Sequence, residues 1–143
     1  MSNKMRWRYG DTNPVMAKPD EDAHIEIGDL VFQFRDRVYP AQVLMEEGYD
    51  PETLKKHFMG VAMQESKPGQ TAPIRIATTG VFEFEWPEVR RPLGTMVHCA
   101  GNQSVWPTME VEGAIGRVAR IVEKGEASVL VDIVSTVMKG GVR

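Results

Sequence analysis

Ala114–Met138 reads AIGRVARIVEKGEASVLVDIVSTVM, which is two runs of β-branched and apolar residues joined by a polar segment at 123–126. Valine and isoleucine favour strands, and a short polar joint with one glycine is typical of a hairpin loop. From Val129 to Ile133 the apolar residues lie two apart, which puts Asp132 on the other face of the strand. The stretch therefore predicts an antiparallel strand pair in which Asp132 faces solvent or an interface.

A second stretch, Phe58–Phe82, follows the same plan. Gly60 and Gly69 are nine residues apart, like Gly116 and Gly125 in the first stretch, and IRIATT at 74–79 parallels VDIVST at 131–136. Two glycine-opened hairpins of similar length are typical of a domain built from related halves. We predict a mainly β fold, either a small β-barrel or a β-sandwich, built from hairpins.

The segment that follows this hairpin supplies aromatic core residues. Phe82, Phe84 and Trp86 alternate with Glu83 and Glu85, so the three aromatic side chains share one face of a strand. Three aromatic rings on one face would fill much of a small core. The two glutamates are expected on the solvated face.

One short helix is predicted near 51–58. Asp50 can cap the free amide groups, and Pro51 suits the first helical position. Leu54 and Phe58 lie four residues apart and form one short apolar edge. Residues 41–49 fit either a helical turn or a loop.

The composition divides the chain into an extended N-terminal arm, residues 1–23, and a single β-rich domain, residues 24–143. The arm is polar and charged, with one dense cluster of arginine and aromatic side chains: Arg6, Trp7, Arg8 and Tyr9. Such clusters are favoured at protein interfaces. A disordered tail fits the same composition, but our prediction is an arm that becomes ordered on a neighbouring subunit.

The bulk composition excludes several classes of protein. A net charge of −3 in 143 residues gives no overall basic surface for nucleic acid. The single cysteine, Cys99, excludes an intrachain disulfide and a cysteine zinc site. There is no apolar run long enough to span a bilayer and no apolar segment behind the N-terminus, so we expect neither a membrane partner nor a secretory signal.

No catalytic motif is evident. The three histidines are not spaced with Cys, Asp or Glu in a known metal pattern, so no metal or cofactor is predicted: His24, His57 and His98. His98 and Cys99 are strand neighbours, which point to opposite faces and cannot form a nucleophile pair directly. We expect a protein that is not an enzyme.

Five short apolar sequence motifs follow one another along the chain: GVA at 60–62, IRIATTGVF at 74–82, PLG at 92–94, IGRV at 115–118 and VLV at 129–131. This order, over about residues 58–138, resembles small β-rich proteins that decorate or cement the heads of tailed phages. The resemblance implies a bacteriophage structural protein on the capsid surface of the virion, assembled in the host cytoplasm. It also implies head stabilisation, with a homotrimer that clamps neighbouring subunits of the major capsid protein and uses no cofactor.

For that role we expect two sets of contact residues. The first is the arm cluster, and the second lies in loops: Arg90, Arg91 and Trp106. Deletion of residues 2–20 is expected to weaken capsid binding and to leave the fold intact.

Two other functions remain open from the sequence. A cellular β-barrel interaction or ligand-binding module would have a deep apolar pocket with a few polar groups. A small hydrolase would have a dispersed site, for example around His98 and the Glu83–Glu85 strand.

Overall fold

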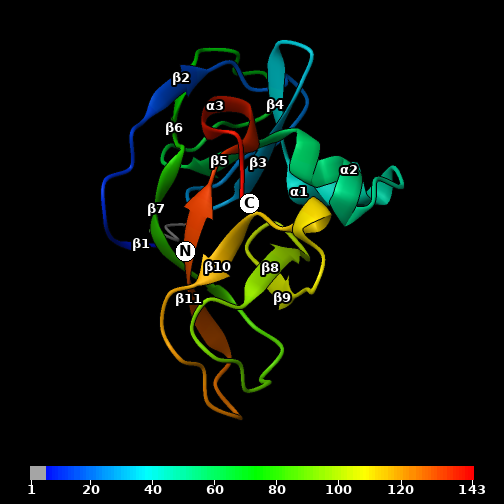
Figure 1. The fold of residues 1–143 in the computed structure, drawn as a ribbon. Helices are drawn as coiled ribbons and strands as arrows, with labels where there is room; N and C mark the ends of the chain where they lie inside the picture. Colours follow the sequence, from blue (N-terminus) through cyan, green and yellow to red (C-terminus); the bar gives the residue numbers. More distant parts are fainter. Residues whose placement is uncertain (1–5) are drawn as a thin grey trace.

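The computed structural model describes residues 6–143, and it contains two antiparallel sheets packed as in a β-sandwich (Figure 1). The six-stranded sheet has the order β1 (Trp7–Tyr9), β7 (Thr79–Glu85), β11 (Ser128–Val134), β10 (Gly116–Val118), β8 (Met96–Cys99), β9 (Val105–Pro107). The five-stranded sheet has the order β2 (Val15–Ala17), β6 (Ile74–Ala77), β5 (Phe58–Ala62), β3 (Leu30–Phe34), β4 (Arg37–Pro40). The mainly β prediction is confirmed, and of its two alternatives the sandwich is right.

The helices are short and lie outside the sheets. They are α1 (Ala41–Glu46), α2 (Pro51–Lys56), α3 (Thr136–Lys139) and a 3₁₀ turn, η1 (Val111–Gly113). The predicted helix is α2, where Asp50 Oδ1 accepts a hydrogen bond from the Thr53 amide at 2.8 Å and Leu54 is buried. The ambiguous segment 41–49 contains α1. Among residues 6–143, no helix has the length and apolar character that a bilayer crossing requires.

The predicted hairpin of the last stretch is confirmed, with two corrections. β10 pairs antiparallel with β11, Asp132 is exposed, and Val129, Val131 and Ile133 are buried. However, the strand ends at Val134, because the Ser135 hydroxyl caps α3 by accepting from the Met138 amide at 3.1 Å.

The second correction concerns the loop of the same hairpin. β10 ends at Val118, so the loop is longer than the predicted turn at 123–126. Val122 leaves the sheet and pairs instead with Arg91, whose amide donates to the Val122 carbonyl at 3.0 Å. Val122, a strand former by composition, is therefore used in a bridge to another loop.

Two hydrophobic clusters lie on the two faces of the five-stranded sheet. The larger cluster fills the space between the sheets and includes the predicted aromatic residues Phe82, Phe84 and Trp86. The smaller cluster covers the outer face: Ile25, Val31, Val38, Met59, Ala62, Ile74 and Ile76. The five-stranded sheet is therefore buried on both faces, and the segment from β2 to Ile25 helps to cover the outer one.

Residues 6–23 are extended, and in this chain they lie along the edges of both sheets. β1 pairs with β7, and β2 pairs with β6. Residues 1–5 of the predicted arm lie outside the described residues. The division into an arm and a body at residue 23, and the docking of that arm on a neighbour, stay predictions.

Candidate contact surfaces

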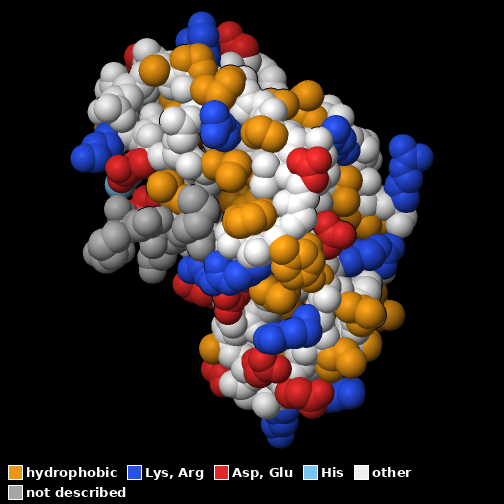
Figure 2. All heavy atoms as spheres, turned by 90° about the vertical axis from the view of Figure 1, so that its left-hand side faces the viewer, with side chains coloured by type: hydrophobic (Ala, Val, Ile, Leu, Met, Phe, Trp, Pro, Cys, Tyr) orange, Lys and Arg blue, Asp and Glu red, His pale blue; other side chains and the backbone are white. Residues whose placement is uncertain are grey.

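The first candidate surface, the β1 surface, consists of Trp7, Tyr9 and Met16. Their exposed fractions are 40%, 50% and 58%, which is high for side chains of this size. The side of the molecule that carries β1 and β2 faces the viewer in Figure 2, where hydrophobic side chains gather in a band. The Trp7 indole is oriented, because its Nε1 donates to the Gly10 carbonyl at 3.0 Å.

The two arginines beside this surface make contacts within the chain. Arg8 Nε donates to Glu83 Oε1 at 2.9 Å. Arg6 donates to Gln103 and to the Glu83 carbonyl, and its Nη2 lies 3.7 Å from Glu85 Oε2. A hydrogen bond from the Ser128 hydroxyl, followed by the contact with Arg8, lowers the pKa of Glu83. Arg6 and Arg8 therefore fix β1 on β7, and the aromatic rings remain available for contact.

The second candidate surface, the β9 surface, consists of Trp106, Met109, Leu93 and Arg91. Trp106 lies on β9, an edge strand, and not in a loop as predicted; it pairs with His98 and is 54% exposed. Met109 is 96% exposed and Leu93 is 63% exposed. A cavity of about 180 Å³ is lined by Arg91 and Met109, together with Thr95, Pro107 and Thr108.

The loop arginines differ in how firmly they are placed. The backbone of Arg91 is held on Val122 by two hydrogen bonds, whereas Arg90 is an exposed residue with its Nε 3.6 Å from Glu123 Oε2. Leu93 and Met109 were not predicted from the sequence, because a single apolar residue in a turn follows no period. The two surfaces lie at opposite edges of the six-stranded sheet, so the predicted contact residues form two patches and not one.

The dispersed hydrolase site is not brought together. His98 on β8 and the Glu83–Glu85 strand β7 are separated by β11 and β10, which corresponds to roughly 14 Å. His98 Nδ1 lies 2.9 Å from the Cys99 carbonyl oxygen. Cys99 is buried as predicted, and burial raises its pKa to about 12.

A cavity of about 360 Å³ lies where β7 and the 100–104 loop meet the start of β3. Most of its lining is polar: Arg6, Glu26, Asp29, Gln42, Glu85, Asn102, Gln103 and Ser104, with Ala100 and Gly101. At its base the buried Asp29 carboxylate accepts from Gln103 Nε2 and from the Glu26 amide, both at 2.9 Å, and burial raises its pKa. This hollow differs from the apolar pocket that a ligand-binding module was expected to have.

No protein-family model matches the chain, and no curated protein matches it. Among solved structures, the chain is similar to the N base of the head fiber gp8.5 in bacteriophage phi29, with a TM-score of 0.53 and 12% sequence identity. The match covers 84% of this chain and 93% of that one. At this identity the similarity is one of fold, and it extends over nearly the whole sandwich.

Proposed function

We propose that this protein is a structural component of a phage head, and that it binds the outer surface of the assembled shell. The observation that carries the proposal is the fold, which is shared over 84% of the chain with the base of a phage head fiber. The exposed aromatic side chains at both edges of the six-stranded sheet, with the exposed Met16 and Met109, support the same role. Such side chains are the residues that anchor protein interfaces.

The proposed partner is the major capsid protein, and the β9 surface is the proposed main contact. Trp106 and Met109 present large apolar area, and Arg91, which lines one cavity with Met109, is held in place by the bridge to Val122. Because the bridge already fixes the Arg91 backbone, binding would cost less ordering entropy than binding through a free loop. A protein that binds the assembled shell in preference to free subunits stabilises that shell by linkage, and many copies make weak contacts collectively strong.

The homotrimer is part of this proposal. The β1 surface lies at the sheet edge opposite β9, so it stays available for contacts between copies while the β9 surface binds the shell, and three copies related by a threefold axis would close into a ring. Light scattering on the purified protein would give three times the 16.0 kDa of one chain for a trimer. A mass of one chain at all concentrations would exclude a ring in solution.

The test of the head role uses purified virions and purified shells. We expect a 16.0 kDa band in near-integer ratio to the major capsid protein on a denaturing gel. We also expect the purified chain to sediment with assembled heads. The affinity for heads should be at least tenfold lower for the Trp106→Ala/Met109→Ala double variant. The exposed Tyr49→Ala variant, away from both surfaces, serves as the control. Absence of the band from virions would contradict the proposal.

A further inference from the structure

A short antiparallel bridge joins two segments that are distant in the sequence. The Ile25 amide donates to the Ser66 carbonyl at 2.8 Å, and the Ser66 amide donates to the Ile25 carbonyl at 2.9 Å. Ile25 and Ser66 are both buried. Because side chains alternate along an extended chain, the neighbours of these two residues point to the opposite, accessible side.

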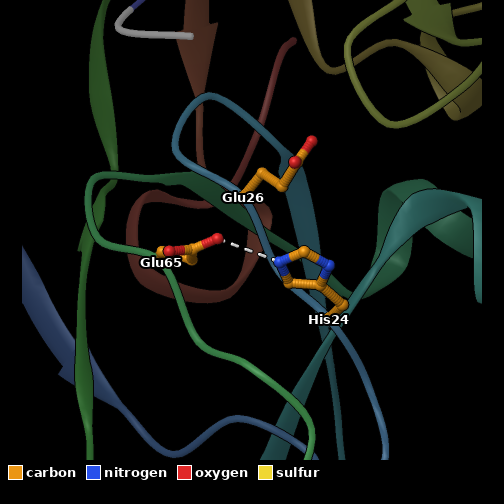
Figure 3. Close-up of side chains that lie close together, drawn as sticks. All are labelled: His24, Glu26 and Glu65. Carbon is orange, nitrogen blue, oxygen red and sulfur yellow. Dashed lines mark hydrogen bonds and ion pairs between the residues drawn. The ribbon is translucent and has the colours of Figure 1, made fainter. Parts of the chain in front are cut away.

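Those neighbours are His24, Glu26 and Glu65. Figure 3 shows His24 and Glu65 pointing toward one another from the two segments, with the Glu26 carboxylate beside them and turned away. His24 Nε2 lies 3.0 Å from Glu65 Oε2. One ligand atom from each of the three residues lies within 4.8 Å of the other two. His24 and Glu26 are two apart on one extended segment, and Glu65 comes from the facing segment, so the backbone pairing itself holds the three together.

The charges around this cluster favour a cation. The segment 19–34 contains five acidic residues and no lysine or arginine. Among residues 6–143, no hydrogen bond or ion pair reaches the Glu26 carboxylate, and the next acid, Asp29, accepts from the Glu26 amide. Two carboxylates thus lie beside one imidazole, and the segment that carries His24 and Glu26 has no lysine or arginine. The strong bases nearby are Lys67, two residues from Glu65, and Arg6, which lines one cavity with Glu26, and neither makes an ion pair with these carboxylates within residues 6–143.

We propose that His24, Glu26 and Glu65 bind a divalent transition metal ion of the zinc class. One imidazole nitrogen and two carboxylate oxygens are a donor set that zinc accepts, whereas calcium and magnesium prefer oxygen ligands alone. Tetrahedral bonds to zinc of about 2.1 Å require donor atoms about 3.4 Å apart. The Glu26 carboxylate must approach the other two donors, and it breaks no hydrogen bond within the described chain when it does so.

The bound ion would join the segment before β3 to the connection between β5 and β6. It would add a link to a bridge that now rests on two backbone hydrogen bonds. Because the three donors are brought together only in the folded chain, binding would raise the free energy of unfolding. This effect is independent of the proposed role on the phage head.

The experiment is a calorimetric titration of the full-length chain with Zn²⁺, repeated with Co²⁺ for its visible absorption. We expect one ion per chain, a Co²⁺ spectrum with tetrahedral character, and affinity lowered at least tenfold in His24→Ala, Glu26→Gln and Glu65→Gln. Two control variants, His98→Ala and Glu46→Gln, change a histidine and a glutamate outside the cluster. Both should bind Zn²⁺ with the affinity of the parent chain. Circular dichroism of each variant checks that it is folded.

Two results would overturn the proposal. The first is the absence of saturable Zn²⁺ binding to the parent chain. The second is binding that His24→Ala leaves unchanged, or that Ca²⁺ matches in affinity, because either would mean general attraction to the acidic segment without coordination by the imidazole.

Discussion

Cys99 shows how the fold suppresses the reactivity of a single residue. Its side chain is buried, its Sγ donates to the Gly101 carbonyl at 3.3 Å, and burial raises its pKa to about 12. The nucleophilic thiolate is therefore almost absent at pH 8. We expect no reaction of the native protein with a disulfide reagent at pH 8, and complete reaction after unfolding in guanidinium chloride. Labelling of the native protein at the rate of a free peptide thiol would contradict the buried placement.

Glu83 is the residue for which the structure predicts a pH dependence of stability. Its pKa is lowered by the Ser128 hydroxyl and then by Arg8. A carboxylate with a lowered pKa stabilises the fold above its unfolded pKa, and this contribution is lost as the pH falls through the folded-state pKa. In urea unfolding from pH 6 to pH 3, Glu83→Gln should therefore lose less stability than the parent. The exposed Glu46→Gln variant should follow the parent curve, and a Glu83→Gln curve that also does so would argue against the contact.

At the scale of the strand, Gly60 and Gly69 show two different reasons why a position requires glycine: close contact with a neighbouring strand, and a positive φ alone. Both have positive φ, but a Cβ on Gly60 would lie 1.8 Å from the Ala77 carbonyl oxygen, whereas a Cβ on Gly69 would meet nothing within 4 Å. Gly60→Ala should cost about 3 kcal/mol or more, because two strands must separate. Gly69→Ala should cost about 1 kcal/mol, for backbone strain alone. Equal losses in chemical denaturation would mean that the strands do not approach so closely at Gly60.

The elements that could be predicted from the sequence are those with local signals. The cap at Asp50 and the alternation from Val129 to Ile133 depend on neighbours within a few residues, and both predictions were confirmed. The prediction of a strand beyond Val134 was wrong, because β-branched residues there form α3 once Ser135 caps it. Local propensity does not show which segment a strand-forming residue will pair with. Val122 pairs with Arg91, about thirty residues earlier in the chain, and its neighbours in sequence do not indicate this.

Sites that combine distant segments were harder to predict. Trp106 was recognised because arginine and aromatic residues are typical of interfaces, but the cavity that brings Met109 to Arg91 forms only where two loops meet. His24 and Glu26 already alternate in the sequence, whereas Glu65 joins them through a backbone bridge across about forty residues. The spacing of the histidines alone could not show that cluster.

At the scale of the molecule, the N-terminal segment connects the two sheets. β1 is the edge strand of one sheet and β2 of the other, and Val15 and Ala17 pack on the outer hydrophobic cluster. A deletion of residues 2–20 would remove both strands and expose the edges of β7 and β6. The expectation that this deletion leaves the fold intact therefore does not agree with the strand pairing.

We expect the 2–20 deletion to lower the free energy of unfolding by several kcal/mol and to promote self-association, because exposed sheet edges pair with other chains. The Trp7→Ala/Tyr9→Ala double variant keeps both strands and changes only exposed side chains, so its stability should stay within about 1 kcal/mol of the parent. Urea unfolding and light scattering distinguish the two. If the deleted chain were monomeric and as stable as the parent, the N-terminal strands would contribute nothing to the sandwich. In that case, weaker head binding by the deleted chain could be assigned to lost contacts. If the deletion instead destabilises the fold, only the double variant can test whether Trp7 and Tyr9 contact the head.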